Sequence, residues 1–103
     1  MSDYERITAV PMREVFQRAE AILTTQIDLK KTRETRHAVT YSGAEGTVTL
    51  DVHRHGTSTS VIARTNQLRT SRLDAVVRYL LNQLPYQPGD PPRWAVAQQA
   101  SPK

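Results

Sequence analysis

The 103-residue chain contains no cysteine, and this absence excludes several chemistries. A disulfide framework, a thiolate nucleophile and a zinc finger with cysteine ligands are ruled out. No apolar run approaches the roughly 20 residues that a membrane-spanning helix needs. The first residues also lack the basic and apolar segments of a signal peptide. We therefore expect a cytoplasmic protein that does not interact with a membrane.

Aromatic residues are scarce as well, at 6% of the chain. Hydrophobic residues make up 38%, which is enough for one modest core, and the length allows one domain. The 14 lysines and arginines exceed the 10 acidic residues and give a formal charge of +4. This balance is compatible with an anionic partner, but a modest net charge also aids solubility whatever the partner is.

Two segments have the apolar periodicity of amphipathic helices. Residues 12–27 follow Pro11, which suits a first helical turn, and residues 71–84 end at Pro85. The apolar residues recur three and four positions apart, so each segment has one apolar stripe that can face a sheet. The stripes are formed by Met12, Val15, Phe16, Ala19, Ile22 and Leu23, and by Leu73, Val76, Val77, Leu80, Leu81 and Leu84.

Between these helices the apolar period changes to two, which is typical of half-buried strands. We predict strands over 32–41, 47–54 and 57–65, and a short first strand over 4–10. The result is a single α+β domain over residues 1–84 with the order β-α-β-β-β-α. Both helices pack on one face of a curved antiparallel sheet, and the other face is polar. Residues 85–103 are rich in proline and are expected to form a disordered tail that includes Trp94.

Counting through the turns predicts how the strands pair. A two-residue loop at 55–56 sets Leu50 opposite Val61 and His53 opposite Ser58. A four-residue first loop gives three further pairs, namely Arg36 with Asp51, Glu34 with His53, and His37 with Leu50. In this register His37 lies on the helix-covered face and is semi-buried.

The strand over 47–54 carries a candidate metal site. Asp51, His53 and His55 are two residues apart, so on a strand their side chains point the same way. Two histidines and a carboxylate can hold zinc or iron. Asp51, His53 and Ser58 also have the residue types of an acyl-transfer triad, but nothing in the sequence predicts an oxyanion hole. Because a flat solvated face also lacks the surroundings of a reactive metal, metal binding is the second alternative and catalysis is not expected.

Basic residues at the strand ends form a candidate binding rim. The predicted pairing brings Lys30, Lys31 and Arg33 to the end of the sheet where Arg54 lies, with Arg36 on the polar face. Such a cluster attracts phosphate and makes nucleic-acid binding the first alternative. A second group (Arg64, Arg69 and Arg72) falls near the start of the second helix. The polar face carries no aromatic platform for stacking bases, which argues against single-strand binding.

The sequence therefore predicts a non-enzymatic interaction module without a cofactor. Its polar sheet face and strand edges are available for a partner protein or for a second copy of the chain, and we expect a homodimer. The residues predicted to bind are Lys30, Lys31, Arg33, Arg36 and Arg54.

Overall fold

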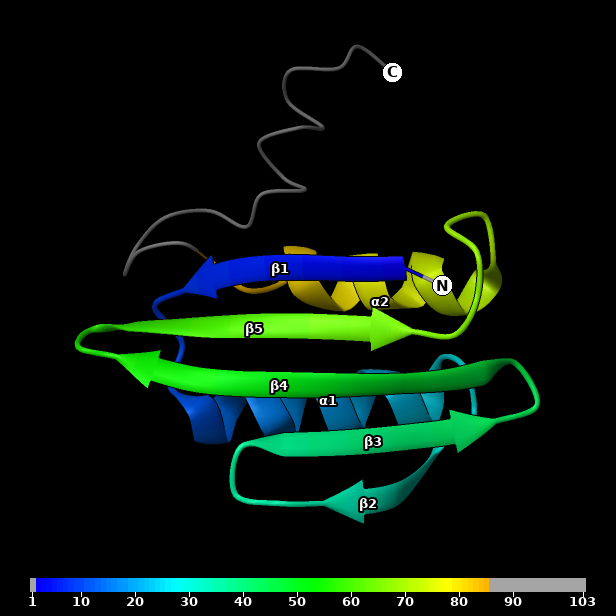
Figure 1. Ribbon diagram of the computed structural model, residues 1–103, viewed down its shortest axis with the longest axis horizontal. Helices are drawn as coiled ribbons and strands as arrows, with labels where there is room; N and C mark the ends of the chain where they lie inside the picture. The colour runs from blue at the N-terminus through cyan, green and yellow to red at the C-terminus, as the bar shows by residue number, and fades with distance from the viewer. Residues whose placement is uncertain (1, 86–103) are drawn as a thin grey trace, which may run out of the picture.

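A computed structural model describes residues 2–85 and contains, in that range, five strands and two helices (Figure 1). In chain order these are β1 (Ser2–Thr8), α1 (Met12–Thr25), β2 (Lys30–Glu34), β3 (Ala38–Gly43), β4 (Gly46–His55), β5 (Ser58–Thr65) and α2 (Arg72–Asn82). The predicted α+β class is confirmed. The tail prediction lies outside the described residues, apart from Pro85. None of the described helices is long and apolar enough to cross a membrane, and the cytoplasmic location stays a prediction.

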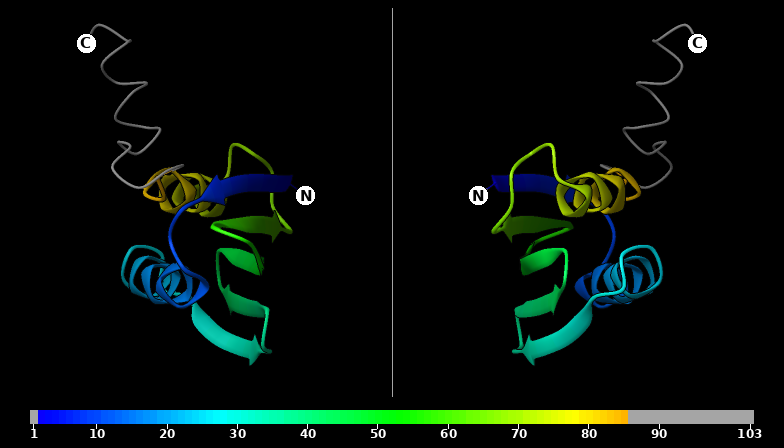
Figure 2. Two further views of the ribbon diagram at one scale, coloured as in Figure 1. Left: turned by 90° about the vertical axis from the view of Figure 1, so that its left-hand side faces the viewer. Right: turned by 90° about the vertical axis from the view of Figure 1, so that its right-hand side faces the viewer.

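The five strands form one open antiparallel sheet in the order β1-β5-β4-β3-β2. β1 and β2 are therefore the two edges. Both helices lie on the same side of the sheet, as the views in Figure 2 show. In Figure 1, α2 lies behind β1 and β5, and α1 lies behind β4 and β3. This arrangement leaves the other face of the sheet without a covering layer in the described part of the chain.

The apolar stripes predicted for the helices form the core with the inward residues of the strands. α1 buries Val15, Ala19 and Leu23, and α2 begins at Ser71, whose hydroxyl accepts the backbone N–H of Asp74. Such a cap satisfies one of the free donors in the first helical turn. The largest fully buried side chains are Tyr41, Leu23, Leu29, Leu50, Leu73, Leu80 and Leu84.

The single strand predicted over 32–41 is wrong, because two strands and a turn occupy this region. β2 and β3 pair with each other as a hairpin, closed by a bond from Thr35 N to Ala38 O of 2.8 Å. All five residues of β2 are exposed, so the strand buries no apolar side chain and has no period-two signal. Since the polar segment before Ala38 gives no pattern, the sequence could not separate the two strands.

The predicted registers are also shifted, by two residues at both turns. The β3–β4 loop consists of Ala44 and Glu45 alone, so Asp51 faces Ala38 and Leu50 faces Val39. The three pairs predicted from a four-residue loop are therefore wrong, and His37 is exposed rather than semi-buried.

The β4–β5 turn is formed by residues 56–57, so His53 faces Ser60 and Leu50 faces Ala63. Ser58 faces His55 instead of His53. A shift of two residues keeps the side chains within β3, β4 and β5 on their predicted faces, which is why the apolar face was predicted correctly despite the wrong register. His37 is the exception, because it lies in the turn between β2 and β3 rather than in a strand.

Candidate functional site

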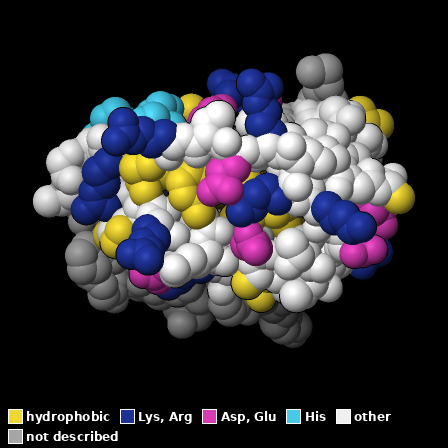
Figure 3. All heavy atoms as spheres, turned by 90° about the horizontal axis from the view of Figure 1, so that it is seen from below, with side chains coloured by type: hydrophobic (Ala, Val, Ile, Leu, Met, Phe, Trp, Pro, Cys, Tyr) yellow, Lys and Arg dark blue, Asp and Glu magenta, His cyan; other side chains and the backbone are white. Residues whose placement is uncertain are grey.

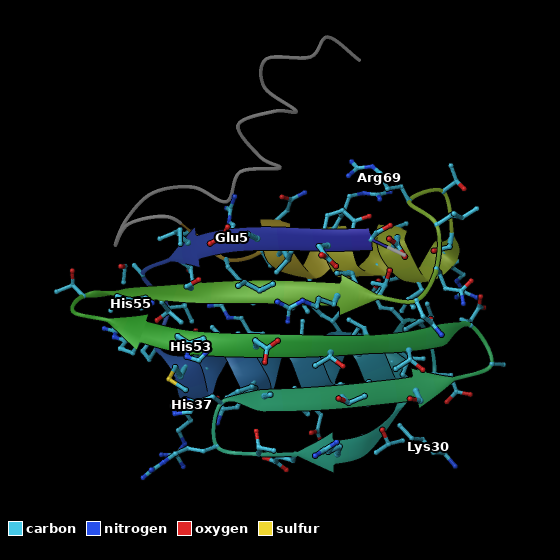
Figure 4. The ribbon with its side chains drawn as sticks, in the orientation of Figure 1. Glu5, Lys30, His37, His53, His55 and Arg69 are labelled. Atoms are coloured by element: carbon cyan, nitrogen blue, oxygen red, sulfur yellow. The ribbon has the colours of Figure 1, made fainter. Side chains whose placement is uncertain are left out.

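The structure does not bring the predicted basic rim together. Lys30 lies at one end of the β2 edge, whereas His55 lies at the opposite end of the sheet, where β4 meets β5 (Figure 4). Arg54 precedes His55 and folds back onto its own hairpin. Its Nε donates to Gly56 O at 3.1 Å and its Nη1 to Thr59 Oγ1 at 2.8 Å. The five predicted residues therefore do not form one continuous positive surface.

Lys31 contributes little free charge, because two carboxylates hold its ammonium group. Its Nζ lies 3.1 Å from Glu34 Oε1 and 3.1 Å from Glu20 Oε1. These hydrogen bonds raise the pKa of Lys31, and the bond from Lys31 lowers the pKa of Glu20. All three groups are solvated, so the pairs are worth little to stability. They nevertheless neutralise the cation on which a phosphate site would depend.

The candidate metal residues make other contacts. Asp51 Oδ2 accepts a hydrogen bond from Arg64. The ring of His53 stacks on that of His37, with centroids 5.3 Å apart and planes at 23° (Figure 4). Within residues 2–85, no group of three His, Asp or Glu side chains is arranged to hold a metal ion. The stacked pair was missed because the predicted register put His37 on the covered face.

The β2 edge carries two features that discourage the addition of another strand. Its pairing with β3 is interrupted by a bulge between Lys31 and Arg33, and it begins with two lysines. Bulges and lysines are two of the devices by which edge strands avoid pairing with other chains.

A groove of about 550 Å³ separates β2 and β3 from α1, with Phe16, Val39 and Tyr41 among its lining residues. Figure 3 looks onto this edge and shows hydrophobic surface between side chains of both charges. The pair between Lys31 and Glu20 bridges this groove. Tyr41 Oη donates to Glu20 Oε1 at 3.2 Å. Burial, followed by the charge of Glu20, raises the pKa of Tyr41 to about 12.

The β1 edge differs from the β2 edge. Seven consecutive residues pair with β5 without a bulge, and none of them is lysine or proline. The side chains alternate between the two faces. Asp3, Glu5 and Ile7 are exposed on the outer face, whereas Tyr4 and Arg6 point toward α2. Within the described residues, no strand lies beside this edge.

A second groove, of about 490 Å³, lies between β1 and α2, and Tyr4 is its best-fixed side chain. Tyr4 Oη donates to Asp74 Oδ2 at 2.7 Å and accepts from Arg78 Nη1 at 3.1 Å. The same Arg78 nitrogen donates to Arg69 O at 2.9 Å. The guanidinium carbons of Arg69 and Arg78 lie 5.3 and 5.8 Å from the centre of the Tyr4 ring. Two cations are thus held around one aromatic ring.

Asp74 holds the Tyr4 side chain in place through the hydrogen bond from its hydroxyl group. Its side chain is fully buried, and its Oδ1 accepts from Thr65 Oγ1 and from Ser71 Oγ, both at 2.8 Å. Burial acts to raise the pKa of Asp74, but hydrogen bonds from Tyr4, Thr65, Ser71 and Ser2 outweigh it, so the pKa is lowered. The carboxylate therefore joins β1, β5 and α2.

Sequence reasoning missed this second groove, because its residues are far apart in the chain. Tyr4 lies at the start of the sequence, Arg69 precedes α2, and Arg78 lies inside that helix. Arg69 was grouped with Arg64 and Arg72, but these two pair elsewhere, with Asp51 and Glu45. The sequence signal that could have located the groove is Asp74 three residues after the capping Ser71.

Comparison with known proteins adds no family assignment. No protein-family model matches the sequence, and a search of curated proteins finds no match.

Proposed function

We propose that the protein is a non-enzymatic interaction module that binds an extended segment of a partner protein along the free edge of β1. In this mode the partner adds a strand to the sheet, and main-chain hydrogen bonds supply affinity. The observation that carries the proposal is the contrast between the edges. β2 is bulged and begins with lysines, whereas β1 is regular over seven residues and has neither device.

The groove behind β1 supports the same proposal. An incoming strand would direct alternate side chains to the two faces of the sheet. Those on the helix side would enter the groove and meet Tyr4, Arg69 and Arg78. Those on the other side would lie next to Asp3 and Glu5. A site that contacts both faces of a strand can select its partner by side chain as well as by backbone.

The nucleic-acid alternative has less support than strand addition. It needs a continuous positive surface, but His55, the residue after Arg54, lies at the opposite end of the sheet from Lys30, and the ammonium of Lys31 is held by two carboxylates. The metal alternative has no third ligand beside His53 within the described residues.

Selection of binding peptides tests the proposal. A displayed library of random peptides would be selected on the full-length chain, and the selected peptides measured against two variants. Ile7→Lys gives β1 the protective residue that β2 has, and Tyr79→Lys replaces an exposed apolar side chain of α2.

We expect Ile7→Lys to weaken binding by about tenfold or more, which is about 1.4 kcal/mol. Tyr79→Lys should leave binding unchanged, because Tyr79 does not line the β1 groove. Peptides that bind the wild type and Ile7→Lys equally, or a selection that yields no binders, would contradict the proposal.

A further inference from the structure

We infer that the partner strand carries alternating charges, with basic side chains on the outer face of the sheet and acidic side chains in the groove. This inference rests on the proposed strand addition at β1. It follows from the charges that the two faces of β1 present to an incoming strand.

The outer face of β1 presents two carboxylates without a cationic partner. Asp3 and Glu5 are exposed, and neither forms an ion pair within residues 2–85. Of the two residues that face them on β5, Arg64 is a cation, but its ion pair is with Asp51. Asp3 faces Arg64, which pairs with Asp51 instead, and Glu5 faces Ile62. Opposite charges directly across a strand pair are stabilising, so an added strand that sets Lys or Arg there is favoured.

The helix side of β1 presents the opposite charge. Neither Arg69 nor Arg78 lies within ion-pair distance of a carboxylate in the described part of the chain. The recorded hydrogen bonds of Arg78 go to neutral oxygens, those of Tyr4 and of the Arg69 backbone. Asp74 lies beneath, but it is fully buried and its oxygens already accept from hydroxyl groups. A carboxylate in the groove would therefore meet two guanidinium groups that form no ion pair among the described residues, next to the parts of Asp3 and Glu5 that also line this groove.

The two faces together define a sequence pattern. Because consecutive strand residues point to opposite faces, a basic residue on the outer face is followed by an acidic residue in the groove. The complementary segment is therefore an extended peptide in which Lys or Arg alternates with Asp or Glu.

The same charges disfavour a second copy of the chain at this edge. A two-fold axis would pair β1 with the β1 of its partner in antiparallel register. Three registers keep each face of the sheet continuous and pair at least five residues of each strand. The first sets Glu5 opposite Glu5, the second sets Asp3 opposite Glu5, and the third sets Arg6 opposite Arg6. Since like charges directly opposite are destabilising, the occupant is a foreign strand. Homodimerisation through another surface stays a prediction.

Three capped peptides of about ten residues test the pattern on the full-length protein. The first alternates lysine with glutamate, the second has the same composition in two blocks, and the third alternates threonine with glutamine. Each would be titrated into isotope-labelled protein while the backbone amide signals are followed. The titrations would be repeated at about 0.5 M salt, where exposed ion pairs are screened.

We expect the alternating charged peptide to shift the amides of β1 and to bind at least about tenfold more tightly than the block peptide at low salt. Arg69→Ala should remove most of this preference. Arg33→Ala, which removes an exposed arginine at the other edge, should leave it intact.

The results distinguish a failure of the charge pattern from a failure of strand addition itself. If the neutral peptide or the block peptide shifts β1 as strongly as the alternating one, the charge pattern is wrong but strand addition stands. If no peptide shifts β1, the inference and the proposed function both fail. A mass of two chains with β1 amides at the interface would also overturn the inference, because the occupant would then be a second copy.

Discussion

At the residue scale, Asp74 has the most structural consequences. It is buried and forms no ion pair with any cation among residues 2–85, and three hydroxyl groups satisfy its oxygens instead. Hydrogen bonds to a charged group are worth more than neutral ones, and an acidic residue in the first turn of a helix is favoured by the helix dipole. Since Tyr4 is one of these partners, Asp74 also sets the position of the ring that holds Arg69 and Arg78.

Replacement of Asp74 by alanine should destabilise the protein by about 2–4 kcal/mol, because three buried or half-buried hydroxyl groups lose their acceptor. Urea denaturation measures this change. Glu14→Ala is the matched control, since Glu14 is also acidic and in a first helical turn but is solvated. We expect the control to cost less than about 0.5 kcal/mol. Equal losses for both variants would contradict the role given to Asp74.

The raised pKa of Tyr41 predicts that the stability of the protein falls at alkaline pH. Its pKa is raised to about 12 in the folded protein, against about 10 in an unfolded chain. Between these values the folded state keeps the proton and the unfolded state loses it. The contribution of Tyr41 to stability is therefore complete below pH 10 and is lost as the pH rises through 12.

Ultraviolet absorbance of tyrosinate checks this prediction. The titration of the wild type should contain one late step that is missing from Tyr41→Phe. The same late step in both proteins would show that another tyrosine is responsible.

At the element scale, the β3–β4 and β4–β5 turns have different tolerances for a side chain. Gly46 has a φ of +131°, and a Cβ there would lie 2.7 Å from Gln67 Cγ and 2.8 Å from Asn66 Oδ1. Gly56 has a φ of +61°, and a Cβ there would have no atom of the described residues within 4 Å. Both positions disfavour an L-residue, but only Gly46 is also crowded.

Gly46→Ala should therefore cost about 2–3 kcal/mol in the free energy of unfolding, and Gly56→Ala about 1 kcal/mol. Thermal or urea unfolding of the two variants side by side measures the difference. If Gly56→Ala were the more damaging of the two, the geometry of the β3–β4 turn would be wrong.

The elements also show how far the sequence could predict this fold. The apolar stripes of α1 and α2 and the period of β4 determined the class and the buried face, because each depends on local spacing. Turn lengths were not determined, since the sequence alone does not tell which residues next to Gly46 and Gly56 belong to the loops and which end the strands. β2 was not separated from β3 because it buries nothing.

The candidate site depends on longer distances in the chain. Tyr4 meets Asp74 only because β1 pairs with β5, which leads directly to α2. A strand is known to be an edge only when its neighbours in the sheet are known, and the sequence did not place the first strand in the sheet. For this reason the basic residues of β2 were predicted as the binding surface, whereas the geometry favours β1.

At the scale of the whole molecule, the core residues of the described part of the chain run from Val10 to Leu84. The carbonyl of Pro85 accepts from Ala9 N at 3.0 Å and from Thr8 Oγ1 at 2.6 Å, which ties the end of this range to the segment after β1. Stability should therefore depend on the chain up to Pro85.

A chain that ends at residue 85 should unfold with a free energy within about 0.5 kcal/mol of the full-length value. A chain that ends at residue 82 loses the buried Leu84 and the bonds to Pro85, and should be less stable by about 3–5 kcal/mol. Urea denaturation of both truncations measures the difference. A large loss in the longer truncation would show that residues beyond Pro85 support the fold.

The central claim is that β1 is the edge that receives a partner strand. The most direct test is a map of backbone amide shifts when a peptide selected from a random library is added to the labelled full-length protein. If β1 receives the strand, the shifts should centre on Ser2–Thr8 and extend to Arg69 and Arg78. Shifts that centre on Lys30–Glu34, or on the groove lined by Phe16 and Tyr41, would contradict it.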